Sequence, residues 1–150
     1  MKYLFFIITC LCFMSLTLLG GDRKLQSINI NPVLEVSSSN SVDMTSQDDG
    51  EVLHVSKKAI LTLKDFTHAN VAMNEGAITL NVVLTKEGGN RIREYTLRNV
   101  GKRLAFIVNG NLINAPKVRD PIVGSGLSID PLDKEVADHL VEQINQRSNL

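Results

Sequence analysis

The chain has 150 residues, of which 43% are hydrophobic and 21% are charged, close to the proportions of an average globular protein with one modest core. Sixteen basic residues balance sixteen acidic ones, so the total charge favours neither nucleic acid nor an anionic membrane surface as a partner. Both cysteines, Cys10 and Cys12, lie in a hydrophobic N-terminal run. The rest of the chain can therefore form neither a disulfide framework nor a thiolate zinc site.

The N-terminus has the layout of an export signal. After Lys2, residues 3–20 form an almost unbroken apolar run without charge, which is typical of a secretory signal. We expect residues 1–21 to be a signal peptide or a membrane anchor, and the rest of the chain to be extracytoplasmic, either periplasmic or secreted. Leu18 and Leu19 are larger than the side chains that a signal peptidase prefers. They leave open the alternative that the run stays uncleaved and anchors the chain in the inner membrane.

The next segment, residues 22–51, is poor in large hydrophobic residues and rich in Ser, Asn and Asp. Such a composition offers too little apolar surface to offset the entropy of ordering the backbone. We interpret the segment as a flexible tether. Ile28 and Ile30 alternate as in a short strand, which Pro32 would end. The folded domain is then predicted to occupy residues 52–150.

Alternating hydrophobic residues predict the first strands of this domain. Residues 52–56 and 60–63 show the pattern, and a turn or short helix is expected at residues 65–69. Residues 77–85 give the clearest strand, because β-branched and aliphatic side chains alternate along it. The pair Gly88-Gly89 is interpreted as the loop that ends this strand.

A helix and a hairpin are predicted next. Residues 90–100 place apolar side chains three to four positions apart, as one stripe of a helix, and Gly101 is a suitable stop. Residues 103–108, which are apolar from Leu104 onward, predict a buried strand. The dipeptide Asn109-Gly110 is a strong hairpin signal, and the returning strand would begin at Leu112.

The chain is predicted to end with one more strand, at residues 126–129, and a helix capped by Asp130 with Pro131 at its first position. Two helices thus interrupt a series of strands, and the short hairpin requires antiparallel pairing. The economical architecture is an α+β fold: a small mixed or antiparallel β-sheet with two helices packed on one face.

No group of residues has the spacing of a catalytic or metal site. His54, His68 and His139 are far apart in sequence and none has a second ligand nearby, so each is interpreted as a surface or packing residue. Ser125 lies between two glycines but lacks the full pattern of a nucleophile elbow, and a turn explains it. We predict no catalytic residue, no metal and no cofactor.

A local excess of basic residues accompanies the helix predicted at residues 90–100. A solvated helix face is enough to explain it. In an exported protein the same side chains could instead face an acidic polypeptide or lipid headgroups, whereas export argues against nucleic acid. The basic residues are Arg91, Arg93, Arg98, Lys102 and Arg103, offset by Glu87 and Glu94.

Several short motifs occur in a fixed order between residues 61 and 146. They are Leu-Thr and Asp-Phe at the start, Thr-x-x-Asn, Gly-Lys-x-Leu-Ala, an Asn-Gly turn, Ala-Pro, a glycine two residues after Ile122, and Glu-x-Ala in the last helix. In this order they resemble the head part of the first periplasmic domain of SecD, a subunit of the bacterial protein-export translocase. Asp130-Pro131-Leu132 departs from the Gly-x-Phe that the family usually has there. The residues that carry the resemblance, called the signature residues below, are Thr96, Asn99, Gly101, Lys102, Ala105, Gly110, Ala115, Pro116, Gly124 and Ala137.

The resemblance implies a binding role with signature residues that are structural. The partner would be a translocating or unfolded polypeptide or a protein of the export machinery, and the membrane would be contacted only through an uncleaved N-terminal segment. The family's six-helix membrane domain is not in this sequence, so we do not expect a proton-driven motor. We predict a non-enzymatic interaction domain. A structural envelope protein and a small extracytoplasmic hydrolase are the alternatives, since fold does not fix function.

Overall fold

The structure is a computed structural model that describes residues 25–148. The predicted signal peptide or anchor lies outside these residues. No helix in the described part of the chain is long and apolar enough to cross a membrane. The elements are β1 (Ile28–Leu34), β2 (Ser41–Thr45), β3 (Val52–Ser56), β4 (Leu61–Thr62), the 3₁₀ turn η1 (Leu63–Asp65), β5 (Phe66–Asn74), β6 (Ala77–Leu84), α1 (Lys86–Arg98), β7 (Leu104–Val108), β8 (Asn111–Asn114), β9 (Gly126–Ile129) and α2 (Lys134–Arg147).

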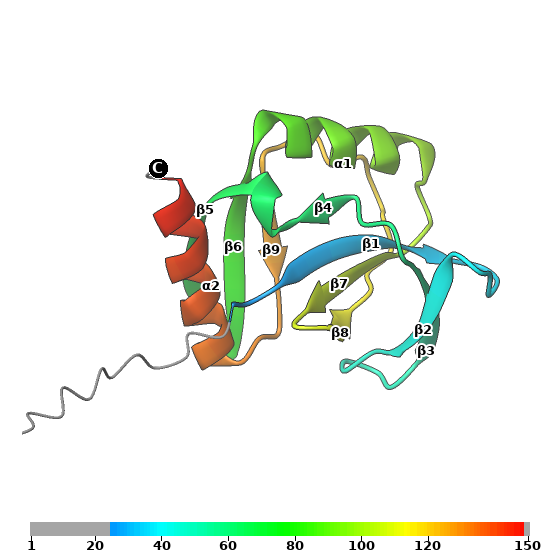
Figure 1. Ribbon diagram of the computed structural model, residues 1–150, viewed down its shortest axis with the longest axis horizontal. Coiled ribbons are helices and arrows are strands. Elements are labelled where there is room, and N and C mark those ends of the chain that lie inside the picture. The colour runs from blue at the N-terminus through cyan, green and yellow to red at the C-terminus, as the bar shows by residue number, and fades with distance from the viewer. Residues whose placement is uncertain (1–24, 149–150) are drawn as a thin grey trace, which may run out of the picture.

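The strands form two sheets (Figure 1). The larger sheet has the order β2-β3-β1-β7-β8, and β4 adds a short sixth strand beside β1. The smaller sheet has the order β5-β6-β9, and every strand pair in both sheets is antiparallel. Helix α2 packs against β5 and β6, whereas α1 contacts β4 and β6. The predicted α+β class with two helices is confirmed, and the strands divide between two sheets where we expected one.

The tether predicted for residues 22–51 is wrong from Ile28 onward. Strand β1 lies in the middle of the larger sheet and pairs with β3, β4 and β7, and Ile30 is 0% exposed. The strand also continues past Pro32, because the amide of Val33 donates to the carbonyl of Arg103 at 3.1 Å. The few apolar residues of this segment suffice because they occupy a central strand, where neighbouring strands supply both the burial and the hydrogen bonds.

Strand β7 separates two hydrophobic clusters. Leu104, Phe106 and Val108 point into the main cluster, which the two helices and the smaller sheet help to form. Ala105 and Ile107 point to the opposite side, into a smaller cluster with residues of β3 and β8. The sequence-based prediction that both faces of this strand are buried is confirmed, as is the hairpin turn, where Asn109 and Gly110 have φ angles of 52° and 80°.

The larger sheet curls around the smaller cluster until its two outer strands meet. Ser46, just after β2, forms a parallel bridge with Leu112 of β8, and the amide of Gln47 donates to the carbonyl of Leu112 at 2.9 Å. The free edges of β2 and β8 are therefore partly used against each other.

The sequence analysis missed β2, which lies inside the predicted tether, and it also missed β5. A turn or short helix was expected at residues 65–69, where β5 starts. Strand β5 forms a long hairpin with β6, and the turn between them places Glu75 and Gly76 at φ angles of 49° and 85°. The segment is hard to recognise because exposed polar residues, His68 and Asn70, alternate with its inward side chains.

Both helices begin at other residues than predicted. Helix α1 starts at Lys86, and the side chain of its cap, Thr85, accepts from the amide of Gly88 at 3.0 Å. The glycine pair thus lies in the first turn of the helix, and a Cβ on Gly88 would come within 3.1 Å of the Cβ of Asp65. Helix α2 is capped by Asp133, which accepts from two amides, and not by Asp130.

Candidate functional site

The signature residues at the end of α1 attach the loop between β8 and β9. Thr96 is buried, and its hydroxyl donates to the carbonyl of Ile92 at 2.8 Å and accepts from the amide of Ile122 at 3.0 Å. The side chain of Asn99 donates to the carbonyl of Tyr95 at 2.8 Å. The bond from Ile122 to Thr96 attaches the loop to the helix, and the other two bonds lie within the end of the helix.

The same loop is also bonded to the chain that leads into β7. The amide of Gly101 donates to the carbonyl of Val118, and the amide of Val118 donates to the carbonyl of Lys102, both at 2.8 Å. Pro116 accepts from the amide of Leu104 at 3.0 Å, and Ala115 accepts from the side chain of Arg103 at 2.6 Å.

The remaining signature residues lie apart from this loop attachment. Ala105 and Ala137 are fully buried, one in each hydrophobic cluster. Gly110 takes the left-handed φ of the β7–β8 turn. Gly124 is exposed, and a Cβ there would make only an ordinary contact at 3.9 Å. These four residues thus lie at separate places in the fold, and nothing at Gly124 requires a glycine.

The candidate residues considered from the sequence lie on different elements: His54 on β3, His68 on β5, His139 on α2 and Ser125 just before β9. No group of three His, Cys, Asp or Glu side chains within residues 25–148 could hold a metal ion. His68 and His139 lie on the surface as predicted. His54 pairs across two strands with Asp43 at 2.6 Å. Ser125, expected in a turn, lies in a bend just before β9, and its carbonyl accepts from the amide of Leu84 at the end of β6.

The outer edge of β5 is the first candidate binding surface. In the two-residue hairpin, Asn74 and Ala77 are the closing pair, so Ala69, Val71 and Met73 direct their amides and carbonyls away from β6. At Ala69 both groups are occupied by the side-chain amide of Asn145 from α2, at 2.9 and 3.0 Å. No hydrogen bond from the described residues outside the hairpin reaches the backbone of Val71 or Met73.

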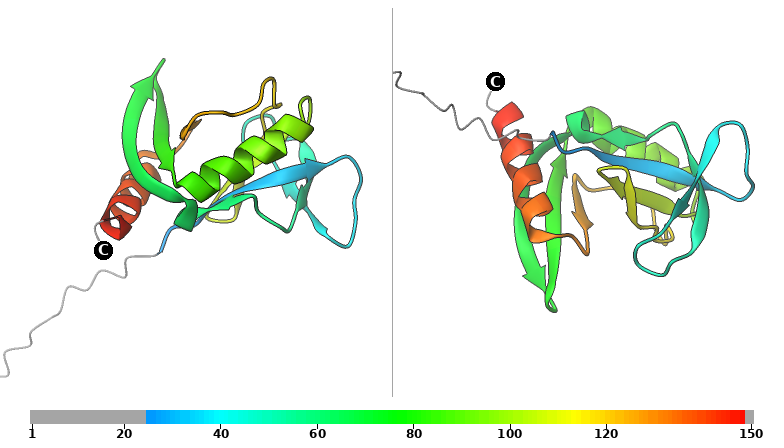
Figure 2. Two further views of the ribbon diagram at one scale, coloured as in Figure 1. Left: turned by 90° about the horizontal axis from the view of Figure 1, so that it is seen from above. Right: turned by 60° about the horizontal axis from the view of Figure 1, so that its bottom comes forward.

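This uncapped half of β5 projects from the molecule. Figure 2 shows the tip of the β5–β6 hairpin extending beyond α2 and away from the other elements. Met73 is 70% exposed although its side chain is apolar. The backbone groups of Val71 and Met73 and the exposed Met73 side chain are called the open β5 edge below.

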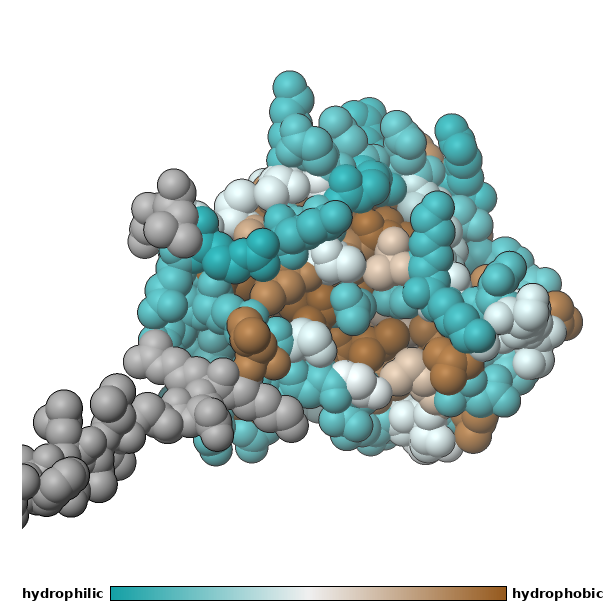
Figure 3. Space-filling view, viewed as in Figure 1, coloured by the Kyte–Doolittle hydropathy of each residue, from teal (hydrophilic) through white to brown (hydrophobic). Residues whose placement is uncertain are grey.

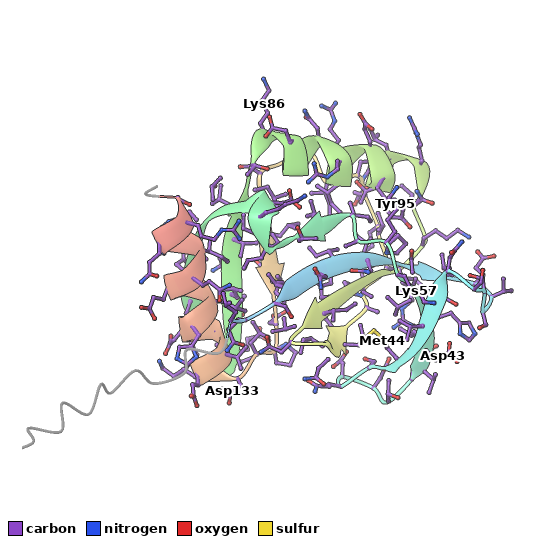
Figure 4. The ribbon with its side chains drawn as sticks, viewed as in Figure 1. Asp43, Met44, Lys57, Lys86, Tyr95 and Asp133 are labelled. Atoms are coloured by element: carbon purple, nitrogen blue, oxygen red, sulfur yellow. The ribbon has the colours of Figure 1, made fainter. Side chains whose placement is uncertain are left out.

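The second candidate is a groove of about 560 Å³ between α1 and the β4–η1 segment, called the α1–β4 groove below. Figure 4 shows Tyr95 on the side of α1 that faces the strands. Partial burial there raises the pKa of the Tyr95 phenol. In Figure 3 hydrophilic side chains crowd over α1, above hydrophobic ones in the centre of this face. The groove is lined by Lys58, Ala59, Ile60, Thr62, Lys64, Asp65, Arg91, Glu94, Tyr95, Arg98 and Asn99.

An ion pair joins the two sides of this groove. Asp65 is 5% exposed and pairs with the guanidinium of Arg91. Its other carboxylate oxygen accepts from the amide of Thr62 at 2.8 Å, and Arg91 donates to the carbonyl of Ile60 at 3.2 Å. Sequence reasoning placed Asp65 in a turn and Arg91 on a solvated face. The Thr-x-x-Asp spacing of a capping box was the one signal that could have indicated the role of Asp65.

These features define a small two-sheet α+β domain that exposes a strand edge and a charged groove. Residues 39–146 match the family model of the SecDF P1 head subdomain, and the chain belongs to that family. The resemblance inferred from the sequence motifs is thereby confirmed.

Relatives and solved structures agree with this assignment. The chain is 29% identical over 106 residues to the protein translocase subunit SecD of Aquifex aeolicus, covering 70% of this chain and 20% of that protein. It is 32% identical over 131 residues to SecD of Rickettsia bellii, covering 82% and 26%. The chain therefore spans about a fifth to a quarter of these relatives.

Two solved structures share the fold. One is described as the membrane component SecDF that enhances protein export, with a TM-score of 0.59 at 20% identity, covering 79% of this chain and 61% of that one. The other is SecDF in its super-membrane-facing form, with a TM-score of 0.63 at 21% identity, covering 79% and 18%.

Proposed function

We propose that this chain is a non-enzymatic, extracytoplasmic domain that binds extended or unfolded polypeptide during protein export. Membership of the SecDF P1 head family supports the proposal, as do the names of the relatives, which are protein translocase subunits. The apolar N-terminal run supports a location outside the cytoplasm.

The single observation that carries the binding role is the open β5 edge. An extended chain can add to such an edge as a further strand, because its own amides and carbonyls match those that Val71 and Met73 direct outward. Main-chain pairing depends little on sequence, which suits a domain that meets polypeptides of many sequences. The exposed Met73 side chain adds a flexible apolar contact of low selectivity.

The test is a binding measurement with a short labelled peptide of alternating Thr and Val residues. Met73→Pro removes the outward amide without touching the β5–β6 ladder, and we expect it to weaken binding about tenfold. Met73→Thr keeps that amide and is the matched control, with a change of less than about twofold.

A second peptide keeps the test independent of how the protein variants fold. Methylating every backbone nitrogen of the Thr-Val peptide removes the donors along both of its edges, and we expect this peptide to bind about tenfold more weakly or not at all. Equal binding of the methylated and unmethylated peptides would refute pairing at the open β5 edge.

The location is tested separately. A reporter that is active only outside the cytoplasm, fused after Leu150, should be active. An inactive fusion that accumulates in the cytoplasm would contradict the proposed export.

A further inference from the structure

The α1–β4 groove differs from the open β5 edge in both chemistry and place. We infer that it is a second interaction surface, which binds an acidic segment of a polypeptide chain through its cationic walls. The inference does not depend on strand addition at β5, because the two surfaces share no residue.

Strand addition inside this groove is blocked by the protein's own side chains. The carbonyl of Ile60 is occupied by Arg91, and the amide of Thr62 is occupied by Asp65. An incoming strand would need to displace the Arg91–Asp65 pair, whose aspartate is almost fully buried. Recognition in the groove must therefore rely on side-chain charge and shape and not on backbone pairing.

The charges that remain at the mouth of the groove are mainly positive. Lys58 and Lys64 are exposed on the strand side and Arg98 on the helix side, with Glu94 as the one exposed acid of the lining. Within residues 25–148 no ion pair engages Lys58, Lys64 or Arg98. Since the whole chain has a formal charge of zero, this local excess is a distinct feature that carboxylate side chains complement.

The shape favours a chain over a membrane surface. Lys58 and Lys64 line one side of the groove and Arg98 lines the other. A chain that enters the groove is therefore close to positive charge on two sides, whereas a flat bilayer would contact only the outermost side chains. Tyr95 is half-buried in the lining and offers an aromatic contact to a side chain that enters. Glu94 would repel a uniformly anionic lipid surface. A polypeptide whose carboxylates are spaced along the chain can place them beside the lysines and Arg98 and away from Glu94.

The experiment compares labelled peptides of alternating Glu and Ser, Lys and Ser, and Gln and Ser. We expect the Glu-Ser peptide alone to bind, and its binding to weaken as salt is raised. Lys64→Glu and Arg98→Glu should each weaken it about three- to tenfold. The matched control is Arg93→Glu, which makes the same charge change on α1 at an exposed residue outside the groove lining; it should change binding less than about twofold.

Three results would overturn the inference. One is equal binding of the Glu-Ser and Gln-Ser peptides. Another is an Arg93→Glu effect as large as that of Arg98→Glu, which would show attraction to net charge alone. The third is binding to phosphatidylglycerol vesicles that depends on Lys64 and Arg98 while the Glu-Ser peptide does not bind. Met73→Pro should leave Glu-Ser binding unchanged, so a failure of strand addition at β5 can be told apart from a failure here.

Discussion

The two sheets differ in how the backbone groups of their edge strands are hydrogen-bonded. In the larger sheet the outer strands β2 and β8 meet through Ser46 and Leu112, and side chains of α1 and η1 occupy the edge of β4. In the smaller sheet Asn145 caps β5 at Ala69, and the capping stops before Val71 and Met73. Exposed edges favour pairing with other chains, so the smaller sheet is the one equipped to accept a strand.

In both sheets, side chains of helical segments substitute for a missing neighbouring strand. Asn145 offers one acceptor and one donor to Ala69, as the backbone of a neighbouring strand would. Arg91 and Asp65 do the same for Ile60 and Thr62. Where such a substitute is absent, as at Val71 and Met73, the backbone groups stay open for the strand addition proposed above.

Removing β1 and β2 should break the larger sheet completely. A chain that starts at Glu51 lacks the central strand, to which β3, β4 and β7 pair. We expect no cooperative thermal unfolding of this chain, whereas a chain that starts at Asp22 should melt cooperatively. Cooperative melting of the shorter chain would show that the smaller sheet and its helices fold without the larger one.

Phe106→Ala should give the next largest effect, because it opens the main cluster that both sheets share. Phe106 is 7% exposed, and truncation of a buried phenylalanine costs about 3–5 kcal/mol of unfolding free energy. Urea denaturation measures the change. Val123→Ala is the control, since Val123 is 74% exposed and should change the midpoint little. An unchanged midpoint for Phe106→Ala would mean that this strand is not part of the core.

Local signals explain which parts of this fold could be predicted from the sequence. The β7–β8 hairpin was predicted because Asn109-Gly110 fixes a turn regardless of context. Strand β6 was predicted because apolar and other side chains alternate along it, a pattern that indicates a strand without information from the rest of the chain. The motif order from residue 61 to 146 was sufficient for the family.

The missed parts depend on partners far away in the chain. β1 is a strand because it pairs with β3, β4 and β7. The polar composition of residues 22–51 as a whole gives no indication of this pairing. β5 is a strand because β6 and α2 hold it. The Arg91–Asp65 pair joins residues 26 positions apart, and no periodicity of either segment points to the other. The open β5 edge was unpredictable for the same reason, since it is defined by the point at which Asn145 stops capping.

Asp65→Ala should leave the amide of Thr62 without its acceptor at the edge of β4. This edge of the larger sheet would then have a free backbone group, as the open β5 edge does. The half-buried amide of Thr62 loses its acceptor and Arg91 loses its ionic partner, which we expect to cost about 1–3 kcal/mol. Urea denaturation gives the cost, and Lys64→Ala, at an exposed neighbour, is the control. The freed Arg91 should also strengthen binding of the Glu-Ser peptide, and weaker binding by the folded variant would contradict the charge model of the groove.

Asn145→Ala is expected to change stability least. It tests most directly whether the Asn145 side chain limits the length of the open β5 edge. It removes both hydrogen bonds to Ala69, and because water can replace part of them the cost should be roughly 0.5–1.5 kcal/mol. The open β5 edge then extends by one further outward residue, so the Thr-Val peptide should bind more tightly, by about threefold. His68→Ala, at an exposed residue of the same strand whose backbone groups face β6, should alter neither stability nor binding. Weaker peptide binding by Asn145→Ala, with the protein still folded, would mean that Asn145 supports the ligand site and does not limit it.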